Sequence, residues 1–213
     1  MPSKKNLLKN VKLYLILDRE VCDYPRLFEI LQQALAAGVD IVQLRDKKGS
    51  AQEILKFSKS ARELIKGKIP YIINDRVDLS LVSGATGVHV GQDDIPVRTA
   101  RKILGTKAVL GASCQTFAQA KKAQSEGADY IGFGSVFKTL TKPQRHPMDL
   151  ELLRKVMTEI KIPVFAIGGI TVENLEQLCS LGVQRVAVCR DICLAKDIGR
   201  AVQQLRRVLD NAG

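Results

Sequence analysis

The chain has 213 residues, of which 46% are hydrophobic, and this is enough to build one domain with a substantial core. Its net charge of +11 would suit a nucleic-acid partner, but Lys and Arg are spread along segments such as 55–68 and 99–107. Aromatic residues make up only 5% and Trp is absent, which leaves few surfaces for base stacking, so we do not expect nucleic acid as a partner.

The cysteines and the first apolar run indicate where in the cell the protein is expected. The five cysteines contain no CxxC pair, so we expect buried free thiols rather than a disulfide framework or a zinc site. The first apolar run, LYLIL at 13–17, is too short for a signal sequence or a membrane span. This predicts a cytoplasmic protein that does not bind membranes, and it leaves the oligomeric state open.

Short apolar runs rich in β-branched residues recur along the whole chain. In order they are LYLIL (13–17), DIVQL (40–44), IPYIIN (69–74), GVHV (87–90), AVLGAS (108–113), DYIGF (129–133), IPVFAI (162–167) and VQRVAV (183–188). Most are separated by roughly ten or more residues in which apolar positions have helical spacing, as at Leu27, Ile30, Leu31 and Ala34. A strand followed by a helix, about eight times over, predicts a (β/α)8 TIM barrel.

Glycine marks the change from helix to strand at four places. Gly38, Gly84, Gly127 and Gly182 each precede an apolar run, where glycine accepts the left-handed conformation that ends a helix. The runs are continuous rather than alternating, as in strands covered on both faces. A doubly wound sheet would need a glycine-rich turn after the first strand, and LILDREVCDYP has none. We therefore predict one barrel domain over residues 13–213, preceded by a basic extension over residues 1–12.

In a TIM barrel the chemistry lies at the carboxyl ends of the strands. After the second run, Gln43, Arg45 and Lys47 alternate along an extended backbone, so an amide and two cations share one side and suit a polyanion. The alternative is three ordinary surface residues. Asp75 and Asp94 follow the third and fourth runs at adjacent strand ends, and they predict oxygen ligands for one Mg²⁺. Helix caps or turns are the alternative for both carboxylates.

The later strand ends add polar side chains and glycines. The polar side chains after the fifth and sixth runs are Ser113, Thr139, Thr141 and Lys142. Gly168 and Gly169 follow the seventh run, where backbone N–H groups can approach an anion beside the next helix. Of the two histidines, His89 is predicted to pack inside the barrel and His146 lies in a loop. No nucleophile with an adjacent base is indicated.

Together these segments resemble the thiamine phosphate synthase family. The resemblance runs from Tyr14 to the final helix and rests on QLRDK (43–47), INDRVDLSLVSGATGVHVGQDD (73–94), LGAS (110–113), TLTKP (139–143), AIGGIT (166–171) and VAV (186–188). It implies a (β/α)8 transferase that joins 4-amino-2-methyl-5-hydroxymethylpyrimidine diphosphate to a thiazole phosphate. The products would be thiamine monophosphate and pyrophosphate.

The resemblance also implies roles for individual residues. The pyrimidine diphosphate would be held by Gln43, Arg45, Lys47, Asn74, Ser113 and Lys142. Magnesium would be held by Asp75 and Asp94. The thiazole phosphate would be held by Thr139, Leu140, Thr141, Gly169, Cys189 and Arg190. Arg190 departs from the family, which usually has serine there, and it could either hold the phosphate or fill its place.

Two other functions stay open on the sequence. A thiazole tautomerase shares this barrel, but the histidine expected after its fifth strand corresponds here to Gln115. A non-catalytic barrel that binds phosphate or nucleic acid would fit the net charge and Arg190. The residues for the pyrimidine diphosphate are all present, which favours the synthase over both alternatives.

Overall fold

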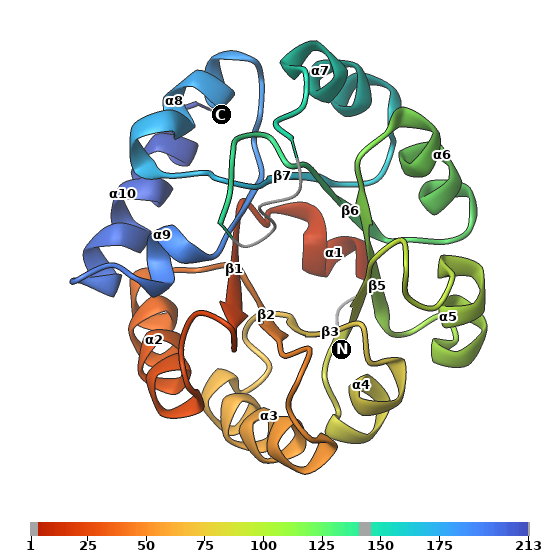
Figure 1. The fold of residues 1–213 in the computed structure, drawn as a ribbon, viewed down its shortest axis with the longest axis vertical. Helices are drawn as coiled ribbons and strands as arrows, with labels where there is room; N and C mark the ends of the chain where they lie inside the picture. The colour runs from red at the N-terminus through yellow and green to blue at the C-terminus, as the bar shows by residue number, and fades with distance from the viewer. Residues whose placement is uncertain (1–3, 141–145, 213) are drawn as a thin grey trace.

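The computed structural model describes residues 4–140 and 146–212, and within them the chain forms a closed barrel of eight parallel strands (Figure 1). The strands are β1 (Leu13–Asp18), β2 (Ile41–Arg45), β3 (Tyr71–Asn74), β4 (Gly87–Val90), β5 (Val109–Cys114), β6 (Tyr130–Phe133), β7 (Val164–Ile167) and β8 (Val186–Val188). Each strand pairs with the next, and β8 closes the barrel by pairing with β1. The predicted single-domain TIM barrel is confirmed.

Helices alternate with the strands along the chain, and all of them except α1 lie around the outside of the barrel (Figure 1). They are α1 (Lys4–Lys9), α2 (Tyr24–Ala37), α3 (Ala51–Ile65), α4 (Val77–Ser83), α5 (Val97–Leu104), α6 (Phe117–Ser125), α7 (Leu150–Glu159), α8 (Val172–Ser180), α9 (Arg190–Cys193) and α10 (Ile198–Asn211). In the described parts of the chain, no helix has the length and apolar character needed to cross a membrane.

Local sequence signals explain where the helices begin and end. Ser50 and Glu53 form a capping box at the start of α3: Glu53 N donates to Ser50 Oγ at 3.2 Å, and Ser50 N donates to Glu53 Oε2 at 2.9 Å. Positive φ angles are found at all four glycines predicted to end helices, Gly38 (97°), Gly84 (65°), Gly127 (96°) and Gly182 (89°). These left-handed angles confirm the prediction, because other residues would be strained there.

The strands separate two apolar layers. The outer layer, between strands and helices, contains buried residues such as Leu15, Leu44 and Val88. The inner layer fills the barrel and contains Tyr14, Ile16, Ile41, Ile72, Val109, Tyr130, Phe165 and Ala187. Because side chains alternate across a strand, one continuous apolar run serves both layers.

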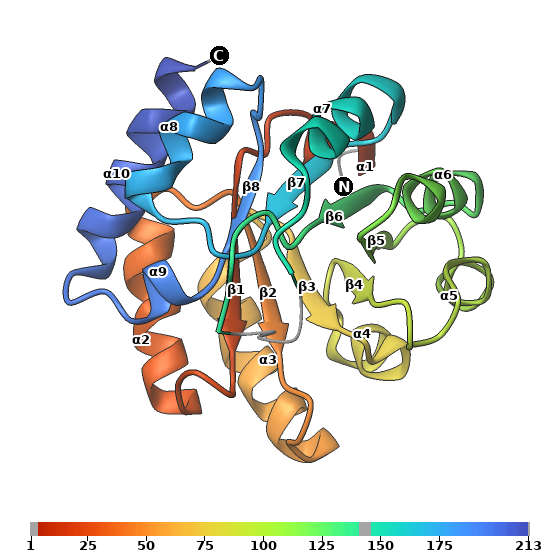
Figure 2. The same ribbon diagram turned by 45° about the horizontal axis from the view of Figure 1, so that its top comes forward.

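Helix α1 covers the barrel at the end opposite to the strand arrowheads (Figure 2). Leu8 in α1 and Val11 just after it are buried, and they belong to the apolar cluster inside the barrel with Tyr14 and Ile41. Arg185 Nη2 donates to Lys9 O at 3.2 Å and links the end of α1 to the segment before β8. Leu8 and Val11, which lie in the predicted basic extension, therefore close this end of the barrel interior.

Replacing Leu8 with alanine is expected to lower the free energy of unfolding by about 2–4 kcal/mol, because a buried leucine loses its contacts and leaves a cavity. Urea unfolding followed by circular dichroism measures the change. Leu81→Ala in α4 is the matched control, because Leu81 is 48% exposed and its replacement should cost about 1 kcal/mol or less. Equal losses in the two variants would contradict the packing of α1 against the barrel.

Candidate active site

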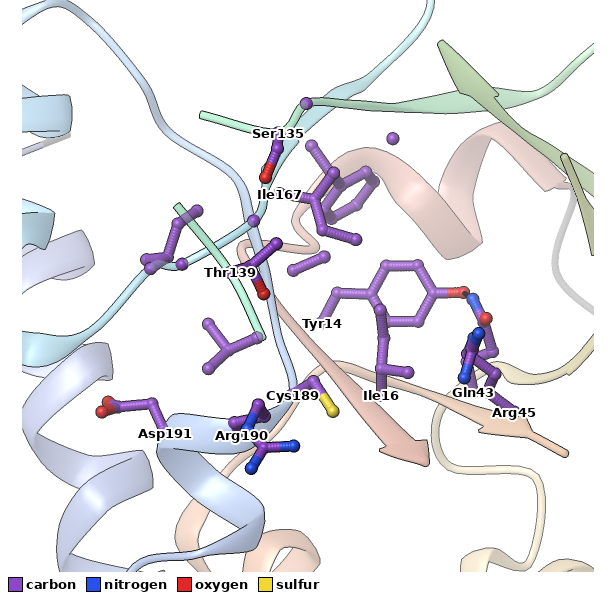
Figure 3. Close-up of a pocket in the computed structure, with 18 of the residues that line it drawn as sticks. Tyr14, Ile16, Gln43, Arg45, Ser135, Thr139, Ile167, Cys189, Arg190 and Asp191 are labelled. Carbon is purple, nitrogen blue, oxygen red and sulfur yellow. Dashed lines mark hydrogen bonds between the residues drawn. The ribbon is translucent and has the colours of Figure 1, made fainter. Parts of the chain in front are cut away.

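A pocket of about 260 Å³ opens at the carboxyl ends of the strands (Figure 3). The predicted site residues that line it are Gln43, Arg45, Asn74, Ser113, Thr139, Leu140, Gly169, Cys189 and Arg190. His89, which was predicted to pack inside the barrel, is buried and also lines the pocket. Thr141 and Lys142 lie outside the described residues. The pocket thus brings residues predicted for the two substrates into one space.

The guanidinium of Arg45 is already paired with carboxylates. Arg45 Nη1 lies 2.8 Å from Asp18 Oδ2 and 3.0 Å from Glu20 Oε2. Asp18 is fully buried and is the β1 partner of Arg45 in the strand register. Hydrogen bonds from Arg45 and Lys48 lower the pKa of Glu20 below its ordinary value. Arg45 is therefore held in position, and it offers less free positive charge than the sequence suggested.

Asp75, Asp94 and Lys47 do not line this pocket, but they come together directly after Asn74, which does. Lys47 Nζ lies 2.8 Å from Asp75 Oδ2. Burial, and then the neighbouring Asp94, raise the pKa of Asp75, while Lys47 opposes this shift. Asp75 N donates to His89 O at 2.8 Å, and Asp75 has a φ of 61° in the left-handed region. Such a backbone conformation costs about 1–3 kcal/mol in a residue other than glycine and is common at functional sites.

Neither Asp75 nor Asp94 occupies the N-cap position of the helix that follows it. The N-cap residues of α4 and α5 are Arg76 and Pro96, and neither makes a side-chain cap hydrogen bond. Asp94 Oδ2 accepts from Gly91 N at 2.7 Å instead, and this stabilises the turn after β4. The structure thus places other residues at both N-cap positions, and Asp94 serves the turn alternative. Within the described ranges, no group of three or more His, Cys, Asp or Glu side chains could hold a metal ion.

Asn74 presents an unused hydrogen-bond donor at the pocket. Its side chain is buried and lines the pocket, and its Nδ2 has no partner among the residues that the structure describes. Leaving a buried amide donor without a partner costs about 1–3 kcal/mol. An acceptor atom on a bound molecule would satisfy it, so Asn74 marks a part of the pocket that suits a polar ligand.

The loops after β6 and β7 pack against each other at the pocket wall. Gly168 and Gly169 have φ angles of 106° and 64°. A Cβ on Gly168 would overlap Ser135 Oγ, and a Cβ on Gly169 would overlap Lys138 O. Phe137 N donates to Gly168 O at 2.9 Å. The two glycines are therefore needed for the packing of the two loops, in addition to the approach of backbone to an anion that the sequence predicts.

Asp191 is a pocket residue that the sequence patterns did not identify. It lines the pocket beside Arg190 at the start of α9 (Figure 3). Val172 N, in the first residue of α8, donates to Asp191 Oδ2 at 3.3 Å. Burial raises the pKa of Asp191. A carboxylate thus lies at the positive end of α8, where an anionic ligand group would otherwise be favoured. In the sequence, the position of Asp191 directly after Arg190 was the one feature that could have pointed to it.

All five cysteines are free thiols, as predicted. Cys114 and Cys193 are buried, as expected, but Cys22, Cys179 and Cys189 are only partly buried. Cys189 lines the pocket, and a hydrogen bond with Cys193 together with burial raises the pKa of its thiol well above the ordinary value. Cys189 therefore stays protonated and acts as an apolar wall rather than as a nucleophile.

The amino-acid sequence has clear relatives. A family model described as thiamine monophosphate synthase matches residues 13–192. A thiamine-phosphate synthase from Fusobacterium nucleatum is 39% identical over 199 residues, which cover 93% of this chain and 97% of that protein. A thiamine-phosphate synthase from Clostridioides difficile is 38% identical over 205 residues, which cover 96% of this chain and 98% of the relative.

Comparison with solved structures points to the same family. Thiamine phosphate pyrophosphorylase from Pyrococcus furiosus has a TM-score of 0.87 and 34% identity, covering 96% of this chain and 98% of its own. A 3-hexulose-6-phosphate synthase has a TM-score of 0.71 at 16% identity and shows the shared fold alone. These matches favour the predicted synthase over the tautomerase and over the non-catalytic barrel. The chain therefore belongs to the thiamine-phosphate synthase family of enzymes.

Proposed function

We propose that the pocket joins 4-amino-2-methyl-5-hydroxymethylpyrimidine diphosphate to a thiazole phosphate and releases pyrophosphate. The observation that carries the proposal is the unsatisfied amide of Asn74 beside the group formed by Lys47, Asp75 and Asp94. A donor for a ring nitrogen then lies next to charged groups that suit a diphosphate and a cation. Membership of the family supports this choice of substrates.

The proposed reaction begins when the bond between the pyrimidine methylene carbon and the diphosphate oxygen breaks. The electron pair leaves with pyrophosphate, and the electron-rich aminopyrimidine stabilises the cation that remains. The thiazole nitrogen then donates its lone pair to that carbon, so no side-chain base is needed. The main task of the protein is to stabilise the charge that develops on the leaving group.

Cationic side chains at the strand ends suit this task. Lys47 and Arg45 offer donors to the diphosphate, and the buried Asp18 keeps Arg45 in position. Lys142 is proposed to join them and lies outside the described residues. A single pocket for both substrates also aligns the thiazole nitrogen with the methylene carbon, which raises the rate through orientation.

Asp75 and Asp94 fit a magnesium ion. The Asp94 carboxylate helps to raise the pKa of Asp75, and a divalent cation held by these residues would relieve this repulsion. Magnesium, when bound, supplies further positive charge to the diphosphate oxygens. Lys47, which pairs with Asp75 at 2.8 Å, would then donate to the diphosphate.

The other side of the pocket is proposed to hold the thiazole phosphate. The described residues proposed for this side are Thr139, Leu140, Gly169, Cys189 and Arg190. Thr141 shares this proposed role outside the described residues. Arg190 offers a guanidinium fork that matches phosphate oxygens, so we assign it to binding rather than to filling the site. Asp191 places an opposing charge next to it.

Replacing Asp191 with alanine is expected to lower the KM for the thiazole phosphate about three- to tenfold, because a carboxylate no longer repels the phosphate at the start of α8. Steady-state kinetics measure the change. The thiazole alcohol, which lacks the phosphate, is the control and should show no difference between the variant and the wild type. A higher KM for the thiazole phosphate would contradict the prediction.

The decisive test mixes the purified protein with both phosphorylated substrates and Mg²⁺ and measures thiamine monophosphate as its fluorescent oxidation product. Product that exceeds a heat-inactivated control and requires both substrates supports the proposal, and no product would contradict it. Isomerisation of the thiazole carboxylate phosphate without coupling would support the tautomerase instead. Salt-dependent binding of nucleic acid without coupling would support the non-catalytic barrel.

The proposed partners are these small phosphorylated substrates, with no role for nucleic acid or a membrane. The proposal also places the protein in the cytoplasm. The charge of the substrates supports this location, because phosphate groups make passage across an apolar bilayer costly and so keep the substrates in the compartment where they are made.

A further inference from the structure

A chain of hydrogen bonds crosses the barrel interior at the pocket. Gln43 Nε2 donates to the Tyr14 hydroxyl at 2.6 Å, and the hydroxyls of Tyr14 and Tyr130 lie 2.8 Å apart. The Tyr130 hydroxyl lies 3.1 Å from His89 Nδ1, and His89 Nε2 lies 2.9 Å from Ser113 Oγ. Figure 3 shows the Tyr14 hydroxyl directed at Gln43. We call these five residues the relay.

Packing fixes the rings of the relay in place. Phe165 meets the Tyr14 ring edge-on, with centroids 5.4 Å apart and an interplanar angle of 77°. It meets the Tyr130 ring in the same way at 5.5 Å and 79°. A Cβ on Gly111 would overlap the Tyr130 hydroxyl and His89 Nδ1, so only glycine leaves room for their hydrogen bond. The fold therefore sets the positions of these polar atoms before any ligand binds.

The direction of each hydrogen bond in the relay follows from the first one. Gln43 Nε2 can only donate, so the Tyr14 oxygen accepts from it. Within the described residues, the Tyr14 hydrogen then has the Tyr130 oxygen as its acceptor, and the Tyr130 hydrogen has His89 Nδ1. Burial raises the pKa of both Tyr14 and Tyr130 above the ordinary value, so both hydroxyls keep their hydrogens at neutral pH.

The opposite direction would leave a buried hydrogen without an acceptor. If His89 carried its hydrogen on Nδ1, Tyr130 would accept that hydrogen and would donate its own to Tyr14. Tyr14 would then receive two hydrogens, and its own hydrogen would have no acceptor in the described part of the barrel. Such an unsatisfied group costs about 1–3 kcal/mol. A hydrogen on Nε2 of His89 avoids this cost.

We propose that Tyr14 and Tyr130 are positioning residues that hold His89 in the tautomer with its hydrogen on Nε2. His89 Nε2 then donates to Ser113 Oγ, which leaves the hydrogen of Ser113 available to an acceptor in the pocket that Ser113 lines. Ser113 and Asn74 thus both present donors to acceptor atoms of the ligand. This inference rests on the proposed function, in which Ser113 contacts the pyrimidine diphosphate.

The tautomer of His89 is measured by ¹⁵N NMR on protein labelled at histidine. The chain has two histidines, and the exposed His146 provides a reference signal. Without substrate, the wild-type protein should show a protonated Nε2 and an unprotonated Nδ1 at His89. A hydrogen on Nδ1 in the wild type would overturn the proposal.

Two variants change the relay in different ways. Gln43→Glu replaces the first donor with an acceptor, so Tyr14 should donate to the new carboxylate and the relay should reverse. The hydrogen of His89 should then move to Nδ1. Tyr130→Phe removes one member, and His89 should show a mixture of both tautomers. Thermal unfolding checks that each variant is folded, and an unchanged His89 tautomer in a folded variant would overturn the proposal.

Tyr71→Phe is the matched control for Tyr130→Phe. Tyr71 is also buried, and its hydroxyl lies 3.0 Å from Ser58 Oγ, away from the pocket-lining residues. This variant loses one hydrogen bond of a buried tyrosine but keeps the relay. It should leave the tautomer of His89 unchanged, and a changed tautomer would overturn the assignment to the relay.

Kinetics separate positioning from general stabilisation. Tyr130→Phe should raise the KM for the pyrimidine diphosphate about five- to tenfold, because Ser113 presents its hydrogen only part of the time. The KM for the thiazole phosphate should stay near the wild-type value, and Tyr71→Phe should change neither. If Tyr130→Phe raised the KM equally for both substrates, or if Tyr71→Phe raised it as much as Tyr130→Phe, the proposed role of the relay would be overturned. The NMR result is obtained without substrate, so it stands even where the coupling assay fails.

Discussion

Replacing Asp75 with asparagine is expected to reduce turnover about 100-fold or more while the fold is kept. Asparagine has nearly the same size and accepts the left-handed backbone, in which Asp75 has a φ of 61°. The change removes one of the two carboxylates proposed to hold Mg²⁺. The same carboxylate pairs with Lys47 at 2.8 Å, so that ion pair is lost as well. The loss should appear in kcat, because the negative charge on the leaving pyrophosphate is greater in the transition state than in the bound substrate.

The measurement for Asp75→Asn is kcat over a range of Mg²⁺ concentrations. The variant should need far more Mg²⁺ than the wild type to approach its own maximum. Asp93→Asn is the matched control, because Asp93 is exposed and lies next to Asp94 in the chain. Unchanged rates of Asp75→Asn at limiting Mg²⁺ would remove Asp75 from the proposed metal site.

Replacing Asp18 with alanine is expected to lower the free energy of unfolding by about 3–5 kcal/mol, because it leaves the Arg45 guanidinium without its buried partner. Both oxygens of Asp18 lie within 2.9 Å of Arg45 Nη1, and Asp18 is fully buried. Urea unfolding measures the loss. Asp78→Ala is the control, because Asp78 pairs with Arg76 on the surface and should cost about 1 kcal/mol or less.

A double variant separates the stability of this pair from its role in the reaction. In Asp18→Leu with Arg45→Met, apolar groups of similar volume replace the charged pair, so stability should return to within about 2 kcal/mol of the wild type. Activity should not return, because Arg45 lines the pocket and is proposed to hold the diphosphate. A double variant as unstable as Asp18→Ala would contradict this explanation of the single variant.

The barrel could be predicted from the sequence because its signals are local. Each strand coincides with a largely apolar run, and helices end at glycines such as Gly38 or begin at caps such as Ser50. Helix α1 has only six residues, too few to show a helical period, so the burial of Leu8 and Val11 could not be predicted. That burial depends on the open end of the closed barrel, which forms only when all the strands are in place.

At the site, the sequence could place side chains at the strand ends but could not identify their partners. Alternation along β2 puts Gln43 and Arg45 on the inside of the barrel, where both line the pocket. The pairing of Arg45 with Asp18 joins residues 27 positions apart, and no local pattern indicates it. The contact of Asp191, in α9, with the first residue of α8 depends in the same way on how two separate helices approach each other.

The position of helix α1 has a practical consequence. Figure 2 shows α1 and the end of α10 on the same side of the molecule, away from the strand arrowheads where the pocket opens. A solid support, a dye or a second enzyme attached at either end would therefore leave the pocket mouth free. The barrel is suited to immobilisation, and to fusion with an enzyme that makes one of its substrates, without obstruction of the route by which substrates enter.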